Sequence, residues 1–109
     1  MKAGETEFLY LTTTGRRSGR PRRIEIWFTE REGRYYLVAE HLWDTQWVQN
    51  VLADPRVEVA VGDAEFPARA RVVEVDAEPD LHAAVQELSE QKYGWGDGLV
   101  VELTPAPST

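Results

Sequence analysis

The sequence contains no cysteine, and its only histidines are His41 and His82. The lack of thiols excludes disulfide scaffolds, zinc sites with thiolate ligands and cysteine nucleophiles. Two histidines this far apart do not indicate a histidine-rich metal centre, so no metal site is expected. The sequence also lacks an apolar run of the roughly 20 residues that a membrane helix needs. Residues 1–8 show no apolar segment typical of a signal peptide. We therefore expect a cytoplasmic protein without a membrane segment.

The composition is that of one ordinary globular domain. Hydrophobic residues make up 42% and charged residues 28% of the 109 residues, a length that suits one core rather than two. We expect a single domain over residues 1–109, in which residues 105–109 form a polar, frayed tail.

Charge is distributed unevenly along the chain. The net charge is −7, yet residues 1–24 hold six basic and two acidic residues, and five arginines fall within Arg16–Arg23. A generally acidic surface repels nucleic acid at long range, so a nucleic-acid partner is not expected. A basic cluster within such a surface instead indicates a compact anionic ligand, such as a phosphate or several carboxylates.

The hydrophobic pattern predicts mostly strands. Residues 22–29 alternate between apolar and other side chains, which is the period of a strand, and a charged turn at 31–33 predicts a hairpin with the following strand. A helix is expected at 45–54, where Trp47, Val48, Val51 and Leu52 form one apolar stripe. Six strands and two helices are expected in all, the strands at 7–14, 22–29, 34–40, 57–61, 65–75 and 99–104, and the helices at 45–54 and 76–92.

This many short strands do not fit one flat sheet flanked by two helices. A small barrel removes most of the exposed sheet edges. We therefore predict a mainly β protein with two helices (α+β), in which six strands form a small barrel and the helices cover its openings.

The arginine-rich segment has the composition of an anion-binding loop. Residues 12–23 read TTTGRRSGRPRR. Glycines let backbone N–H groups approach a ligand, and arginines offer planar cationic groups that match phosphate and carboxylate oxygens. The alternative is a solvated loop whose arginines balance the acidic remainder of the chain. The segment has no Walker motif, and no helix is predicted to follow it as a Rossmann fingerprint requires.

Two motifs resemble those of the deazaflavin-dependent nitroreductase and quinone reductase family. They are LTTTGRRSGRPRR at residues 11–23 and W-x-x-N-x-x-A-D-P-R-V at residues 47–57. The resemblance spans residues 11–75 and identifies a short, divergent member. It implies a split β-barrel of the flavin-reductase or FMN-binding type that binds coenzyme F-420, a deazaflavin with a phosphodiester and an oligoglutamate tail. The implied reaction transfers a hydride from the reduced coenzyme to a quinone, an enone or a nitroaromatic.

The resemblance also implies which residues meet the cofactor. The cationic positions of the family's basic motif fall on Arg17 and Arg22, and its small residues fall on Ser18 and Gly19. Many members also carry a serine-lysine-glycine-glycine loop after the third strand, where this chain has EHLWD at residues 40–44. Protonated His41 is a candidate for the missing cation. The candidate cofactor-binding residues are Gly15, Arg16, Arg17, Ser18, Gly19, Arg22 and His41.

The departure at residues 40–44 leaves two alternatives open. The same arginines could hold the phosphate of FMN, or the barrel could bind a flavin-like anionic small molecule without catalysis. Hydride transfer itself is chemistry of the cofactor, so the lack of a catalytic dyad is no objection.

The aromatic segment at residues 93–98 offers candidates for the acceptor side of the reaction. A proton must reach the reduced acceptor, and Tyr93 is the candidate donor. Tyr93 and Trp95 are also candidates for a wall of the substrate site; the alternative is that both pack over a barrel mouth. A homodimer is compatible with this fold, and the physiological acceptor stays open.

Overall fold

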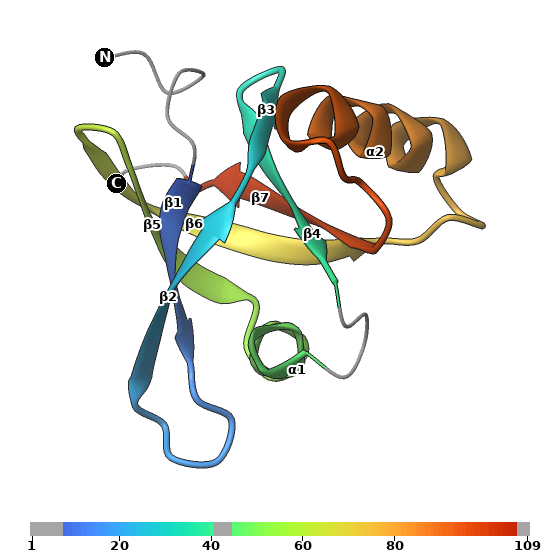
Figure 1. The fold of residues 1–109 in the computed structure, drawn as a ribbon. Coiled ribbons are helices and arrows are strands. Elements are labelled where there is room, and N and C mark those ends of the chain that lie inside the picture. The colour runs from blue at the N-terminus through green and yellow to red at the C-terminus, as the bar shows by residue number, and fades with distance from the viewer. Residues whose placement is uncertain (1–7, 41–44, 107–109) are drawn as a thin grey trace.

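The computed structural model of the protein describes residues 8–40 and 45–106. All the strands in this part of the chain pair antiparallel in one curled sheet of order β2-β1-β5-β6-β7-β4-β3. Figure 1 shows α2 against β4 and β7, whereas α1 lies below the curled sheet, where it contacts β1 and β6. The elements are β1 (Phe8–Thr14), β2 (Pro21–Trp27), β3 (Thr29–Arg31), β4 (Arg34–Ala39), α1 (Gln46–Ala53), β5 (Arg56–Val61), β6 (Ala64–Val73), α2 (Pro79–Tyr93) and β7 (Leu99–Pro105).

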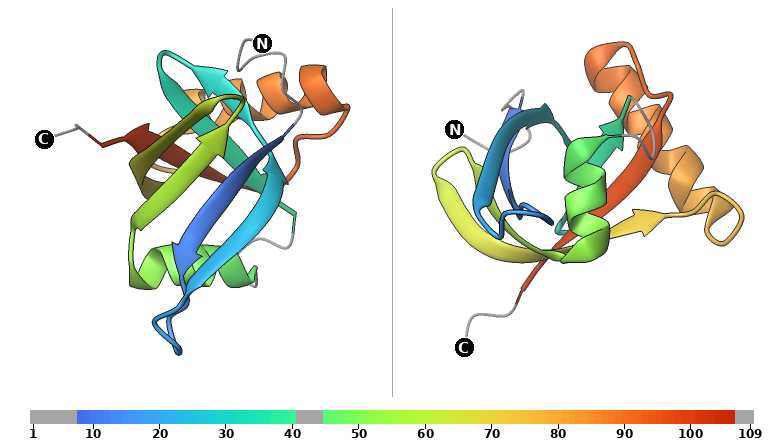
Figure 2. Two further views of the ribbon diagram at one scale, coloured as in Figure 1. Left: turned by 90° about the vertical axis from the view of Figure 1, so that its left-hand side faces the viewer. Right: turned by 90° about the horizontal axis from the view of Figure 1, so that it is seen from below.

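The sheet forms a barrel that stays open between its two edges. The edge strands β2 and β3 are adjacent in sequence but stand at opposite ends of the strand order. Seen from below, in the right view of Figure 2, the sheet curls around a central space without closing. This is the split β-barrel that the family resemblance implied.

The strand count was predicted wrongly, because residues 22–29 form two strands and not one. The break lies at Phe28, whose backbone bonds to two side chains of α2, those of Tyr93 and Lys92. The N–H of Phe28 donates to Tyr93 Oη at 3.0 Å, and that hydroxyl donates to the carbonyl oxygen of Phe28 at 2.8 Å. The predicted hairpin with the following strand therefore holds only for β3, which pairs with β4, while β2 pairs with β1.

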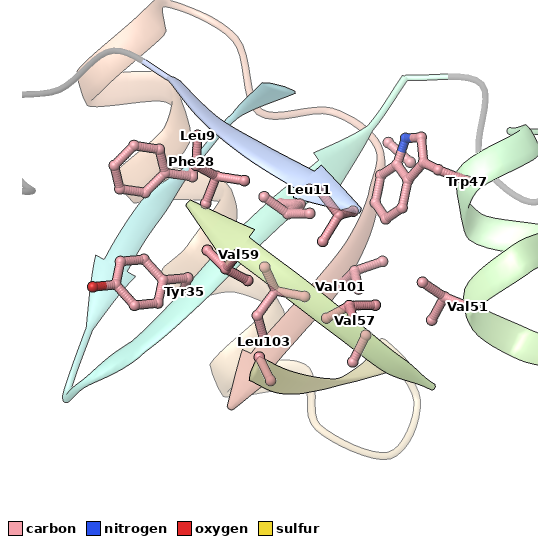
Figure 3. Close-up of a cluster of buried hydrophobic side chains, with 14 of the residues drawn as sticks. Leu9, Leu11, Phe28, Tyr35, Trp47, Val51, Val57, Val59, Val101 and Leu103 are labelled. Carbon is pink, nitrogen blue, oxygen red and sulfur yellow. The ribbon is translucent and has the colours of Figure 1, made fainter. Parts of the chain in front are cut away.

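The core fills the inside of the curled sheet. Alternate residues of the strands point inward, such as Leu9 and Leu11 of β1, and α1 adds Trp47 and Val51 (Figure 3). The predicted stripe of α1 is wrong at Leu52, which is 51% exposed. At 100° per residue, this position lies about 140° from Trp47 and so leaves the buried face.

A second, smaller core joins α2 to the outer face of the sheet. Val85 of α2 packs with Tyr36, Val73 and Val100. The helix has proline in its first turn, where the missing N–H costs no hydrogen bond, and ends at Gly94 with φ +78°. Neither of the helices in the described residues is long and apolar enough to cross a membrane.

A buried carboxylate, that of Glu102, lies beside this second core. It accepts hydrogen bonds from Tyr36 Oη and from Arg71 Nε, both at 2.8 Å. Arg71 also binds Glu78, just before α2, at 2.6 Å. Burial raises the pKa of Glu102, but the hydrogen bonds from Arg71 and Tyr36 outweigh burial and hold this pKa below its usual value.

The predicted tail at 105–109 is wrong for its first two residues. Pro105 ends β7 opposite Ala68, and the N–H of Ala106 donates to the carbonyl oxygen of Pro67 at 2.9 Å. The long strand β6 reaches far enough to pair with both residues. Residues 107–109 lie outside the described residues.

Candidate functional site

The loop between β1 and β2 is a tight turn held by its own backbone. The N–H of Gly15 donates to the carbonyl oxygen of Arg20, and the N–H of Gly19 donates to that of Gly15, both at 2.8 Å. A Cβ atom at Gly15 would lie 2.7 Å from Ser18 Oγ, and Gly19 has φ +71°. The left-handed backbone of the turn favours glycine at Gly19, a side chain at Gly15 would displace Ser18, and the N–H groups of both glycines are used inside the turn. The prediction that these N–H groups approach a ligand is therefore wrong for Gly15 and Gly19.

Helix α1 lies beside this loop and holds it through one buried amide (Figure 1). Asn50 is 6% exposed, and its Oδ1 accepts from Arg16 Nη1 at 2.9 Å and from the Arg16 N–H at 3.3 Å. Its Nδ2 donates to Thr13 Oγ1 at 3.2 Å. The second guanidinium nitrogen, Arg16 Nη2, donates to Gln46 Oε1 at 2.9 Å.

A cavity of about 580 Å³ lies between the loop and α1, and we call it the arginine pocket. Arg17 and Arg22 line it, and their guanidinium groups make no hydrogen bond or ion pair with any other described residue. Arg23 also lines it, with its guanidinium carbon 4.5 Å from the centre of the Tyr10 ring. The pocket therefore presents cationic donors that the described fold does not neutralise.

A second cavity of about 710 Å³, the tryptophan pocket, is lined by residues of β2 and β4 on the open side of the barrel. Three indoles line it, those of Trp27, Trp47 and Trp95, together with the carboxylates Glu25 and Glu40. No basic residue is found in the described part of this lining. Trp47 lines both pockets, so the two are adjacent.

Tyr93 supports the tryptophan pocket from behind and does not line it. Its ring stacks on Trp27 with the ring centres 4.5 Å apart and the planes 1° from parallel, while its hydroxyl bonds to Phe28 as described above. The following residues are also fixed, because Ser89 Oγ donates to the carbonyl oxygen of Trp95 at 2.7 Å. A Cβ atom at Gly96 would lie 2.3 Å from the carbonyl oxygen of Gln86, so only glycine fits there.

A third and larger cavity, the outer groove of about 1000 Å³, crosses the outer face of β5, β6 and β7. Three of its arginines are ion-paired within the chain: Arg56 to Asp54 at 3.0 Å, Arg71 to Glu78 and Glu102, and Arg34 to Glu102 at 3.6 Å. This groove is larger than the arginine pocket but offers an anion fewer unpaired cations.

The structure brings most of the predicted cofactor residues together. Trp95 lines the tryptophan pocket, Gly19 lines the outer groove, and His41 lies outside the described residues. Among the described residues, no three histidine, aspartate or glutamate side chains are grouped to hold a metal ion. The predicted residues that line the arginine pocket are Gly15, Arg16, Arg17, Ser18 and Arg22.

Sequence reasoning missed two contributors to these pockets. Asn50 was noted only as part of a motif, because nothing in a single sequence says which buried partner an amide will meet. Trp27 was treated only as one residue of an alternating strand, and the structure shows that its indole is 49% exposed and lines the tryptophan pocket.

The family model described as F420H(2)-dependent quinone reductase matches residues 2–96. Among solved structures, an F420-H2 dependent reductase is 27% identical over 89% of this chain and 93% of its own, with a TM-score of 0.73. A chain described as a domain-swapped dimer is also 27% identical, over 89% of this chain and 79% of its own, with a TM-score of 0.64.

The heme storage protein HutZ from Vibrio cholerae has a TM-score of 0.78 at 20% identity, over 97% of this chain and 86% of its own, which shows a shared fold alone. A search of curated proteins finds no match. The family model covers most of the chain, which confirms the resemblance seen in the two sequence motifs and supports coenzyme F-420 as the cofactor. The chain belongs to the F420H(2)-dependent quinone reductase family.

Proposed function

We propose that this protein transfers a hydride from reduced coenzyme F-420 to an uncharged quinone, enone or nitroaromatic. The observation that carries the proposal is the junction of the two pockets at Trp47. One pocket offers unpaired guanidinium groups and the other offers flat aromatic walls. A deazaflavin coenzyme needs both, since it joins an anionic chain to a planar ring.

Each pocket has a defined task in this proposal. Arg17 and Arg22 bind phosphate or carboxylate oxygens of the coenzyme, as arginine forks do. The indoles of Trp27 and Trp95 stack on flat rings and exclude water from the reacting atoms. The hydride donor is the reduced coenzyme itself, so the protein needs only to bind, orient and shield the two reactants.

Glu40, which directly follows β4, fits this division. Glu40 lines the tryptophan pocket and is absent from the lining of the arginine pocket, so it does not face the bound anionic chain. Together with Glu25 it gives the acceptor side a negative field. Such a field disfavours an anionic acceptor by about 1 kcal/mol for each close charge in water. This is why we propose an uncharged acceptor.

The assignment of Tyr93 as proton donor stays a prediction. Its hydroxyl hydrogen is donated to Phe28 and its ring supports Trp27, so the contacts support a positioning role for this residue. The substitution Tyr93→Phe separates the two roles. A proton donor would show a lower kcat and an altered pH profile, whereas phenylalanine keeps the ring that stacks on Trp27, so a support for Trp27 would leave the pH profile unchanged.

Three further expectations are proposals of the same kind. The similar chain described as a domain-swapped dimer supports a homodimer, which light scattering of the purified full chain would test. A single domain over residues 1–109 and a cytoplasmic location also stay proposals.

The proposed function is tested by titrating the full chain with coenzyme F-420 and, separately, with FMN, while following tryptophan emission. Trp47 lies between the two pockets, so quenching is expected on binding. Saturable quenching by the deazaflavin, followed by turnover with a neutral naphthoquinone and slower turnover with its sulfonate, would support the proposal. Quenching by FMN alone would mean that the cofactor is FMN. Binding without turnover would favour a non-catalytic binding protein.

A further inference from the structure

We infer that Asn50 is the positioning residue of the arginine pocket, and that it converts Arg16 from a ligand-binding residue into a pin between the loop and α1. The inference rests on the proposed function for the identity of the ligand. Arg16 then has a structural role, whereas Arg17 and Arg22 bind the ligand. The sequence alone does not distinguish these roles, because the three arginines lie in one short segment.

The contacts of Arg16 direct its guanidinium toward α1. One terminal nitrogen donates to Asn50 and the other to Gln46, each at 2.9 Å. The backbone N–H of Arg16 donates to the same oxygen of Asn50. One N–H of each terminal nitrogen is therefore used on a side chain of α1, which turns this end of the guanidinium fork toward the helix.

The amide of Asn50 is suited to this task because it is buried and used at both ends. Its oxygen takes two donors from Arg16, and its nitrogen donates to Thr13, which is 2% exposed on β1. One side chain of α1 thus ties together the last residues of β1 and the first arginine after it. A buried amide whose donor and acceptor are both satisfied fixes one arrangement of its partners.

The consequence is a defined position for the remaining arginines. With Arg16 fixed and Gly15 bonded to Arg20 across the turn, the loop presents Arg17 and Arg22 to the pocket without internal partners. Their mutual placement depends on the pin, because Arg16, Arg17, Ser18, Gly19 and Arg20 are all exposed and only Gly15 of the turn is buried.

The first measurement follows the loop without any coenzyme. Trypsin cleavage after Arg17 reports opening of this exposed turn. We expect Asn50→Leu and Arg16→Met to be cleaved several times faster than the wild type. Leu52→Ala on the same helix is the control, since Leu52 is exposed and distant in angle from Asn50. Asn50→Asp is expected to restore the wild-type rate, because its carboxylate still accepts from Arg16 and the Thr13 hydroxyl can donate to it.

The second measurement asks whether Arg16 touches the coenzyme. We expect Asn50→Leu and Arg16→Met each to raise the Kd for coenzyme F-420 about tenfold, and the double variant to be no weaker than either single one. The dependence of Kd on salt concentration should stay unchanged in Arg16→Met and become shallower in Arg17→Met, because only the latter removes a charge contact with the ligand.

These outcomes decide the inference separately from the proposed function. Additive losses, or a shallower salt dependence in Arg16→Met, would show that Arg16 contacts the coenzyme and overturn the pin. An unchanged cleavage rate in Asn50→Leu would overturn it as well. If the wild type binds no deazaflavin, the proposed function fails, and the cleavage rates of Asn50→Leu, Asn50→Asp and Leu52→Ala still decide whether Asn50 holds the loop.

Discussion

Arginines gather in two regions of this acidic chain, the β1–β2 hairpin and the outer groove, and their surroundings differ. In the outer groove Arg56 and Arg71 form ion pairs with carboxylates at 3.0 Å or less. In the hairpin Arg17 and Arg22 find no carboxylate among the described residues. Arginine side chains thus stabilise the fold in the outer groove. In the hairpin, those of Arg17 and Arg22 are left without a carboxylate partner among the described residues. Pairing within the chain, rather than the local density of arginine, therefore separates the arginines of the two regions, and it is the ground on which we propose the arginine pocket as the binding site.

The largest effect is expected where an arginine neutralises a buried carboxylate. Replacing Arg71 by Met should lower the free energy of unfolding by about 3 kcal/mol, because buried Glu102 would lose its two hydrogen bonds from Arg71 and keep the weaker support of Tyr36 and Arg34. Urea unfolding measures the loss, and the coenzyme Kd of the folded variant should stay within about twofold. A stable Arg71→Met variant with lost binding would reverse the assignment of the two regions.

The second effect is expected in coenzyme binding and not in stability. Replacing both Arg17 and Arg22 by Gln should weaken coenzyme binding about 30-fold, which is roughly 2 kcal/mol, while the unfolding free energy changes by less than about 0.5 kcal/mol. The matched control removes two arginines from the outer groove, Arg56 and Arg69. If that control weakens binding equally, net charge and not the arginine pocket attracts the coenzyme.

A smaller effect is expected in the pH dependence of stability, through the carboxylate of Glu102 in the outer groove. The pKa of Glu102 is lowered in the folded protein, so its contribution to stability is present above the unfolded value near 4.5 and is lost as pH falls through the folded value. Glu102→Gln should therefore be less stable than the wild type at neutral pH but lose less of its stability on acidification. Equal slopes of unfolding free energy against pH below 4.5 would contradict this role.

The sequence predicted the features that depend on a repeating pattern. It did not predict those that depend on a single contact between distant residues. Period-two alternation and proline position located the strands and helices to within a few residues, and two motifs indicated the family. The break at Phe28 could not be read from that alternation, because Tyr93, 65 residues later, provides the hydrogen bonds that allow it. The partners of Arg16 and Arg71 were hidden for the same reason, since each bonds to residues that only the folded sheet brings near.

The smallest effect is expected at the exposed pair of the outer groove. Arg56 bonds to Asp54 through two nitrogens at 3.0 Å, and these bonds lower the pKa of Asp54. Its side chain is nevertheless 81% exposed, so solvent screens the attraction and the chain entropy of the arginine opposes it. Arg56→Gln should lower the free energy of unfolding by less than about 1 kcal/mol, measured by urea unfolding beside Arg71→Met. The two substitutions differ chiefly in whether the partner carboxylate is buried, so similar losses would mean that burial of Glu102 does not set the strength of its network.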